Sequence, residues 1–163
     1  MKLSFILNGA TVRLDAEPDR RAVDLLREEL GALDVKEGCG TGECGACSVL
    51  VDGVQKLSCL MLAAQLEGRT VVTAAGLGTA EKPHPVQRAF AEHGAVQCGF
   101  CTPGMAVAAA GLLAENPAPA REDIRRAVSG NLCRCTGYVK IIDAVEAAAR
   151  ELAARKGKTE DAR

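Results

Sequence analysis

The stretch Gly38-Cys39-Gly40-Thr41-Gly42-Glu43-Cys44-Gly45-Ala46-Cys47 places three thiols and four glycines within ten residues. A further thiol, Cys59, follows a segment that reads as two short strands folded back on each other. Glycines in such a loop allow positive φ angles and let backbone N–H groups approach a bound group without a Cβ in the way. The stretch therefore predicts a loop that presents four thiolates to a metal centre.

The spacing of these thiols discriminates between two kinds of metal centre. Cys-x4-Cys-x2-Cys with a distant fourth cysteine is typical of plant-type 2Fe-2S proteins. A structural zinc site more often uses two Cys-x2-Cys knuckles and has less need for glycines. We therefore predict a first 2Fe-2S cluster, with zinc as the alternative, on the following ligands: Cys39, Cys44, Cys47 and Cys59.

A second set of four thiols lies in the C-terminal half, as Cys98-Gly-Phe-Cys101 and Cys133-Arg-Cys135. Its spacing alone also suits zinc, and an isolated Cys-x2-Cys is found in redox dithiols. Cys101 and Cys135 directly precede Thr102 and Thr136, where we expect two helices to begin, and helix N-termini favour negative charge. We therefore predict a second 2Fe-2S cluster on Cys98, Cys101, Cys133 and Cys135, set inside an apolar helical region, whereas the first set lies near the surface.

Composition excludes several functions. The 163 residues carry a formal net charge of -1, no Trp and few aromatic residues, so the chain has neither a basic stripe nor a base-stacking platform for nucleic acid. The longest apolar run, Met105 to Ala114, is about half the length that a membrane crossing needs. We see no export signal, and all eight cysteines are accounted for as ligands, so disulfides are disfavoured and a cytoplasmic protein is expected.

The first half reads as a small mixed sheet packed on one helix. Asn8-Gly9 and Asp52-Gly53 are turn dipeptides that predict two β-hairpins. The helix is expected over Ala22 to Leu30, with Gly31 as its C-cap. The expected strands are Leu3–Leu7, Thr11–Leu14, Val49–Val51, Val54–Leu57 and Thr70–Thr73. These elements give a first domain over residues 1–75.

The second half reads as helical. From Ala74 the sequence is rich in turn formers, and Ala-rich helical patterns follow it. The expected helices are Val86–Glu92, Thr102–Glu115, Arg121–Val128 and Thr136 to about Arg155. Thr102 is the expected N-cap of the second, with Pro103 at its first position. The last is expected to bury Val139, Ile142, Val145 and Ala149. A second domain over 76–155 and a flexible tail over 156–163 follow.

Groups for catalysis within the chain are scarce. The two histidines, His84 and His93, read as surface residues, and neither is near a free nucleophile if every cysteine is a ligand. Neighbouring carboxylates such as Glu28-Glu29 read as solvated helix faces. Arg134 lies between two predicted ligands, and two interpretations of it stay open. Its charge adjusts the properties of the cluster, or its side chain faces a partner protein.

Three segments resemble the signature motifs of the small iron–sulfur subunit of xanthine dehydrogenase/aldehyde oxidase-type molybdenum hydroxylases. They are Gly38 to Val49, Gln97 to Met105 and Gly130 to Tyr138, and the resemblance runs from about Leu3 to Leu152. Ser48, where Thr is commoner, and Thr41 are small departures that touch no ligand. The resemblance implies an α+β chain with a plant-type ferredoxin-like β-grasp domain followed by a four-helix domain, each holding one cluster.

The resemblance also implies partners. A large subunit would hold the molybdenum–pterin cofactor where substrate is hydroxylated, a medium subunit would hold FAD, and Gln97 and the Cys135 region would lie beside the pterin. The assembly would be a hetero-oligomer, possibly a dimer of heterotrimers. The expected function is electron transfer from molybdenum toward FAD, without a catalytic site in this chain. A free-standing ferredoxin-type carrier is the alternative, and a zinc-stabilised interaction module is a distant third.

Overall fold

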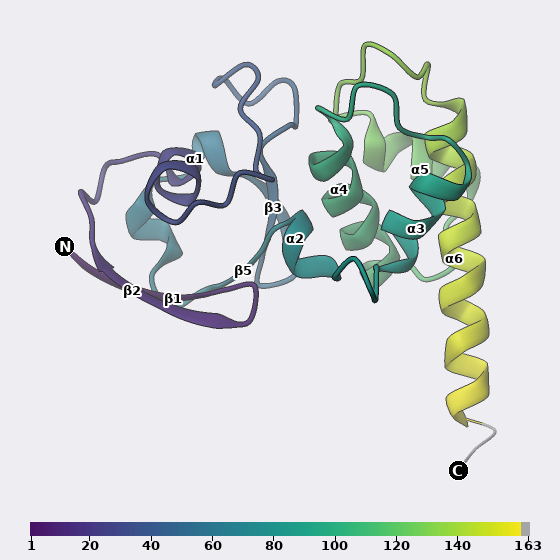
Figure 1. The fold of residues 1–163 in the computed structure, drawn as a ribbon, viewed down its shortest axis with the longest axis horizontal. Coiled ribbons are helices and arrows are strands. Elements are labelled where there is room, and N and C mark those ends of the chain that lie inside the picture. Colours follow the sequence, from purple (N-terminus) through teal and green to yellow (C-terminus); the bar gives the residue numbers. More distant parts are fainter. Residues whose placement is uncertain (161–163) are drawn as a thin grey trace.

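The structure, a computed structural model, describes the backbone of residues 1–160 and the side chains of residues 1–155. Its N-terminal half is built on one mixed sheet of five strands in the order β2-β1-β5-β3-β4 (Figure 1). Only the β1–β5 pair is parallel. The strands are β1 (Lys2–Leu7), β2 (Ala10–Asp15), β3 (Ser48–Val51), β4 (Val54–Leu57) and β5 (Thr70–Val72). The predicted α+β class is confirmed.

Both predicted hairpins form about the predicted dipeptides. Asn8 and Gly9 have φ angles of 50° and 84°, and Asp52 and Gly53 have φ angles of 50° and 81°. These positive angles at both central residues are what a two-residue hairpin turn of type I′ requires. The turns pair β1 with β2 and β3 with β4 in antiparallel register.

One face of the sheet packs on the predicted helix, which differs from a regular α-helix. It begins as α1 (Ala22–Asp24) and continues as a π-helical turn, η1 (Leu25–Glu29), where the Leu30 N–H bonds to the Leu25 carbonyl. Gly31, with a φ of 65°, ends it as predicted. Val23, Leu25 and Leu26 are fully buried against the sheet.

Three short helical segments connect these elements and were not predicted. Two are 3-10 turns, η2 (Ser58–Leu60) and η3 (Ala63–Leu66), and the third is the single-turn helix α2 (Ala74–Leu77). All three are short, so they carry little of the periodicity by which a helix is read from sequence.

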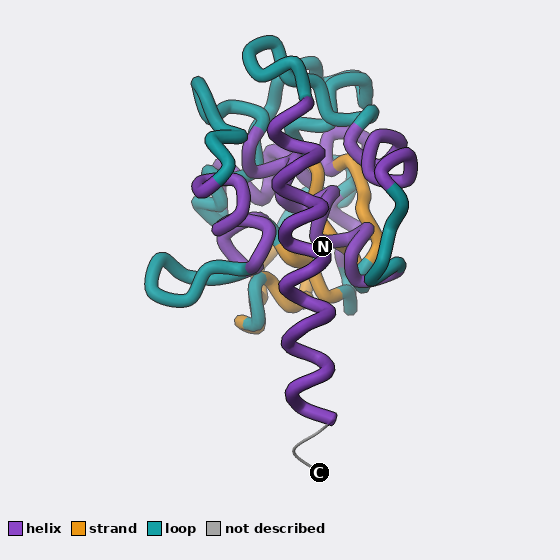
Figure 2. Tube along the Cα trace, turned by 90° about the vertical axis from the view of Figure 1, so that its right-hand side faces the viewer, coloured by secondary structure: helices purple, strands orange, loops and turns teal. Residues whose placement is uncertain are grey.

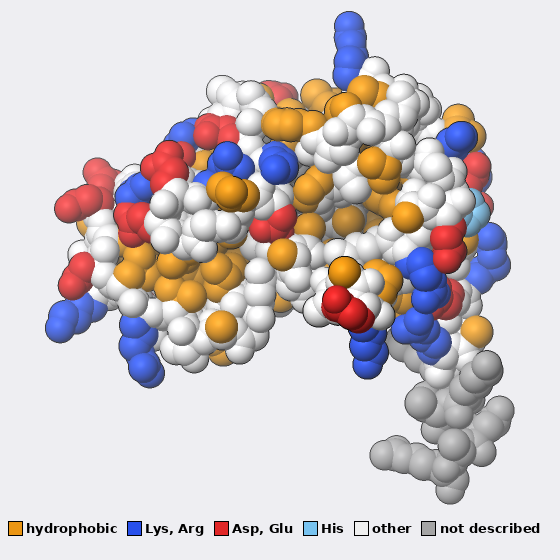
Figure 3. Space-filling model, in the orientation of Figure 1, with side chains coloured by type: hydrophobic (Ala, Val, Ile, Leu, Met, Phe, Trp, Pro, Cys, Tyr) orange, Lys and Arg blue, Asp and Glu red, His pale blue; other side chains and the backbone are white. Residues whose placement is uncertain are grey.

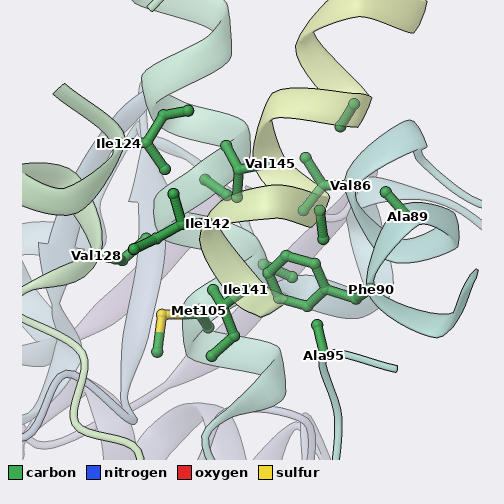
Figure 4. Close-up of a cluster of buried hydrophobic side chains, with 14 of the residues drawn as sticks. Val86, Ala89, Phe90, Ala95, Met105, Ile124, Val128, Ile141, Ile142 and Val145 are labelled. Atoms are coloured by element: carbon green, nitrogen blue, oxygen red, sulfur yellow. The ribbon is translucent and has the colours of Figure 1, made fainter. Parts of the chain in front are cut away.

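The C-terminal half consists of α3 (Pro85–Glu92), α4 (Thr102–Glu115), α5 (Arg121–Val128) and α6 (Val139–Glu160). Phe90, Met105, Ile124, Ile141 and Val145 meet in its core, as Figure 4 shows. The small side chains of α4 are buried on almost every face, because the helix lies between β3 and the other helices. Figure 2 shows α6 in front of the molecule, with its C-terminal turns extending past the other elements.

The two expected helix starts at the cysteine motifs need correction. Thr102 is the first residue of α4, and Cys101 takes the N-cap position that was assigned to Thr102. The last helix begins at Val139 and not at Thr136, because Gly137 and Tyr138 have positive φ angles of 65° and 68°, which a helix cannot contain.

The burial pattern of α6 is largely as predicted. Ile142, Val145 and Ala149 are buried, but Val139 is 60 % exposed, so its predicted burial is wrong. Val139 is the first residue of the helix and lies beside the exposed loop. The helix continues to Glu160, past Arg155 where the pattern ended it. The last part of the predicted tail, residues 161–163, lies outside the described residues.

The two halves share a small core of their own. Leu50 on β3, Ala74 and Val107 on α4 are buried together. Val49 and Val51 face the other way, into the core under η1. Both faces of β3 are therefore covered, which explains why every residue of this strand is buried. Among the described residues, no helix is both long and apolar enough to span a membrane.

Candidate metal centres

The first thiol set lies in the loop between η1 and β3, with Cys59 supplied by η2. Cys47 and Cys59 are buried, Cys44 is half-buried and Cys39 is exposed. The Cys39 sulfur accepts backbone N–H groups from Thr41, Glu43 and Cys44 at 3.4, 3.3 and 3.4 Å. Several amides directed at one sulfur stabilise its thiolate, the form that binds iron.

The electrostatics of this set vary from one thiol to another. The Thr41 hydroxyl, helped by the three backbone amides, lowers the pKa of Cys39 to about 6. Burial, together with the hydrogen bond and charge of the Cys47 thiol, raises the pKa of Cys59 to about 11, and the charge of Cys39 adds to the increase. Cys59 therefore interacts with both Cys47 and Cys39, and a metal would relieve the repulsion between their thiolates.

The glycines of the loop do what the sequence suggested, by two different means. Gly45 has a φ of 71°, and a Cβ there would lie 2.3 Å from the Gly130 carbonyl oxygen. Gly38 has no positive φ, but a Cβ on it would come within 3.0 Å of the Cys44 sulfur. Side chains at these positions would push the loop from its place or crowd a ligand atom.

An ion-pair cluster that sequence reasoning missed supports the same loop. The Arg21 guanidinium donates to Asp24 at 2.8 Å and to Glu37 at 2.7 Å, just before Gly38. A Cβ on Gly40 would lie 3.3 Å from this guanidinium. The sequence carried no signal for it, because Arg21 and Glu37 lie on different segments.

The second thiol set joins two loops. Cys98 and Cys101 precede α4, and Cys133 and Cys135 lie between α5 and α6. Burial raises the pKa of Cys101 to about 12, with further increases from the Cys133 thiol and from Cys98. A hydrogen bond with Cys98 is the main cause of the raised pKa of Cys135. The loops thus meet thiol to thiol in two pairs, an arrangement that suits a two-iron centre with two thiolates on each iron.

Cys133 has its own set of hydrogen-bond donors. The Thr136 hydroxyl donates to its sulfur at 3.0 Å, and the Thr136 N–H does so at 3.4 Å. Burial acts to raise the pKa of Cys133, but these donors outweigh it and the pKa is lowered. The Cys133 N–H donates to the Tyr138 hydroxyl at 2.8 Å, which in turn donates to the Asn131 carbonyl at 3.2 Å.

The environment of the second set differs from the expected one in two respects. Only Cys101 lies at a helix N-terminus, because α6 begins four residues after Cys135. Cys98, Cys135 and the neighbouring Gln97 are exposed, so this set opens to the surface rather than lying inside the helical core. Two large apolar side chains near it, Phe100 and Leu132, are also 48 % and 58 % exposed.

The structure contrasts with that of a protein that binds a single metal ion. Among the residues whose side chains are described, no three or more His, Cys, Asp or Glu side chains are placed to hold a single ion. His84 has a structural role, since its Nδ1 accepts the Val86 N–H at 3.2 Å and caps α3.

Comparison with protein families identifies both halves. Residues 5–74 match the family described as 2Fe-2S iron-sulfur cluster binding domain. Residues 73–146 match a second family, described as 2Fe-2S binding domain. Each match contains one complete set of four cysteines.

Similar proteins match over nearly their whole length. The chain is 50 % identical over 151 residues to the nicotinate dehydrogenase small FeS subunit of Eubacterium barkeri, covering 93 % of this chain and 96 % of that protein. It is 51 % identical over 142 residues to the xanthine dehydrogenase iron-sulfur-binding subunit of Escherichia coli O157:H7, covering 85 % and 88 %.

Solved structures of related oxidoreductases have the same fold as this chain. A chain of quinoline 2-oxidoreductase from Pseudomonas putida 86 superposes with a TM-score of 0.90 at 48 % identity, covering 96 % of this chain and 97 % of that chain. Aldehyde oxidoreductase from Desulfovibrio gigas gives a TM-score of 0.92 at 40 % identity, but this match covers 98 % of the present chain and only 18 % of that one. The chain belongs to the family of small 2Fe-2S iron–sulfur subunits of xanthine dehydrogenase/aldehyde oxidase-type molybdenum hydroxylases.

Proposed function

We propose that this chain is an electron-transfer subunit with two 2Fe-2S clusters, which relays electrons from a molybdenum–pterin site in a large partner toward FAD in a medium partner during substrate hydroxylation. The observation that carries the proposal is the grouping of eight thiols into two sets, each with hydrogen-bond donors on a ligand sulfur. Cys39, Cys44, Cys47 and Cys59 hold the first cluster, and Cys98, Cys101, Cys133 and Cys135 hold the second.

The length of one relative supports a division of labour between subunits. In the aldehyde oxidoreductase of Megalodesulfovibrio gigas, the match to this chain covers 17 % of the protein. We propose that separate subunits supply this chain with the functions of the rest of that protein. We place the substrate site there, in a cytoplasmic hetero-oligomer, possibly a dimer of heterotrimers.

The face toward the large subunit is the one that carries the second thiol set. Gln97 and Cys135 are exposed there, as a contact with a partner's pterin requires. We further propose that residues 1–75 form a ferredoxin-like β-grasp domain and that residues 76–155 form a four-helix domain around α3 to α6. The sheet order and the packing of the helices support this division.

A free-standing ferredoxin-type carrier is the second candidate. Such a carrier gains from a docking surface of one charge sign, which steers its partners. On the face drawn in Figure 3, acidic and basic side chains are interspersed. This observation and the near-neutral net charge favour a fixed assembly.

Metal analysis of the purified full chain tests the proposal. We expect about four iron and four acid-labile sulfide per chain and two distinguishable EPR signals after reduction with dithionite. About two iron, or stoichiometric zinc, would contradict it. The isolated chain should hydroxylate no substrate, and copurification of large and medium subunits from the native host separates the fixed subunit from the free carrier.

A further inference from the structure

The loops that carry the two thiol sets touch each other through their backbones. The Leu132 N–H donates to the Cys44 carbonyl at 2.8 Å. Leu132 is bonded to Cys133, a ligand of the second set, and Cys44 is a ligand of the first. One hydrogen bond and a short run of covalent bonds therefore connect a sulfur of one set to a sulfur of the other.

A buried polar network fixes this contact. The Asn131 side chain is 1 % exposed, and its Nδ2 donates to the Gly45 carbonyl at 2.8 Å and to the Ser48 hydroxyl at 3.2 Å. Gln55 donates to the Ser48 hydroxyl at 3.0 Å and to the Asn131 Oδ1 at 3.3 Å. Both the oxygen and the nitrogen of the Asn131 amide therefore have hydrogen-bond partners, as a buried amide requires. These hydrogen bonds hold the side chain in one orientation.

The backbone of the first cysteine loop closely approaches the backbones of α4 and of the segment around Asn131. A Cβ on Gly104, at the start of α4, would lie 2.6 Å from the Gly45 carbonyl oxygen. A Cβ on Gly45 would lie 2.8 Å from the Asn131 Cα. The first loop thus lies directly against both segments that hold the second set, so a small displacement of Asn131 displaces Leu132 from Cys44.

We propose that Asn131 is a positioning residue, which holds the Leu132 N–H on the Cys44 carbonyl, and that this hydrogen bond is a bridge for electrons between the two thiol sets. An electron that crosses it is lost on the Cys133 side and gained on the Cys44 side, and no bond forms or breaks. The inference rests on the proposed function, because both sets must hold a cluster.

Removal of the Leu132 N–H tests whether this hydrogen bond carries electrons between the two thiol sets. Leu132 is replaced by its α-hydroxy analogue, which turns the peptide N–H into an ester oxygen and keeps the side chain. Leu132→Ala is the matched control, because it keeps the N–H and removes a side chain that is 58 % exposed. The full chain with both clusters is partly reduced by a light pulse, and the redistribution of the electron is followed by absorbance.

We expect the ester variant to redistribute electrons several-fold more slowly than the wild type, with unchanged iron content, while Leu132→Ala keeps the native rate. A native rate in the ester variant overturns the bridge. Iron near two per chain in the wild type would instead defeat the proposed function, so the two failures are distinguishable.

The positioning role is tested by Asn131→Ala. The control is Asn116→Ala, whose side chain accepts only the Ala118 N–H at the exposed end of α4. In the fully reduced chain, the magnetic interaction between the two clusters splits their EPR signals and depends on their separation and orientation. Asn131→Ala should change this splitting and slow the redistribution, and Asn116→Ala should change neither.

If Asn131→Ala fails to retain its clusters, Gln55→Ala provides the same measurement, because it removes the donor to Asn131 Oδ1 from a half-buried position. Native splitting and a native rate in the variant that retains both clusters overturn the positioning role.

Discussion

Gly45 in the first cysteine loop has both an unusual backbone conformation and close backbone neighbours in the other half of the chain. It has a positive φ, and a Cβ on it would clash with Gly130 and Asn131 of the other half. We expect Gly45→Ala to lose both the loop conformation and the contact between the halves. Overpacking costs about 1–3 kcal/mol beyond the backbone strain of a left-handed alanine.

Gly53→Ala is the matched control, because Gly53 has a φ of 81° but no atom within 4 Å of an added Cβ. Thermal unfolding of both holo-variants, with iron content, measures the difference. Equal melting temperatures would show that the close approach at Gly45 costs nothing.

The two sets of cysteines are the residues for which the sequence makes its clearest prediction, because residue type and local spacing define a ligand set. The bonds around Asn131 were not predictable in this way. Its donation to Gly45 spans 86 positions, and nothing in the local sequence marks an asparagine that closes such a contact. Ser48 is a similar case, since it was noted only as a departure from a commoner Thr and proves to accept from both Asn131 and Gln55.

At the scale of elements, the Arg88–Glu151 ion pair joins α3 to α6. We expect Arg88→Met to lower the free energy of unfolding by more than the loss of a within-helix pair would, since this pair links two helices and is partly shielded from water. Arg125→Met is the control, because the ion pair of Arg125 among the described residues is with Glu122 inside α5, and both side chains are more than half exposed. Urea denaturation of both variants at pH 7 measures the difference.

The same pair predicts a pH profile. The hydrogen bond from Arg88 lowers the pKa of Glu151 below its ordinary value of 4.5. A lowered carboxyl pKa gives stability that is present above the unfolded pKa and is lost only as the pH falls through the folded value. The difference between wild type and Arg88→Met should therefore stay constant from about pH 8 to pH 5.5. A difference that fades within this range would contradict the assignment.

Secondary-structure elements could be predicted where a short sequence motif specifies their backbone conformation. Asn8-Gly9 and Asp52-Gly53 marked both hairpins, because few other residues adopt the φ angles of their turns. The start of α6 was missed for the opposite reason, since Tyr138 is an unusual residue at a φ of 68°. Its hydroxyl bonds to Cys133 and Asn131, which stabilises a conformation that the residue type does not suggest.

At the scale of the whole molecule, the order of electron flow can be tested. We expect the second thiol set to receive electrons from the large subunit, because its ligands Cys98 and Cys135 are exposed beside Gln97. In the assembled complex, Cys133→Ala should then leave the N-terminal cluster and FAD oxidised on rapid mixing with substrate. Cys44→Ala should allow reduction of the helical-domain cluster while FAD reduction fails.

Both variants must first be shown to assemble, because loss of a ligand can unfold a metal site. Iron analysis should show that each has lost one cluster and kept the other. If Cys133→Ala still reduced its N-terminal cluster at the wild-type rate, the proposed order would be wrong.

The shared core of Leu50, Ala74 and Val107 has a consequence for the covalent chain itself. The segment Thr79–Lys82 is exposed and adds nothing to that core, so the halves adhere without depending on the peptide bonds between them. After a protease cut there, the two fragments should elute together in size-exclusion chromatography and keep the iron content of the uncut protein. The contact surface, and not the linker, would then be what determines how the two halves are placed relative to each other.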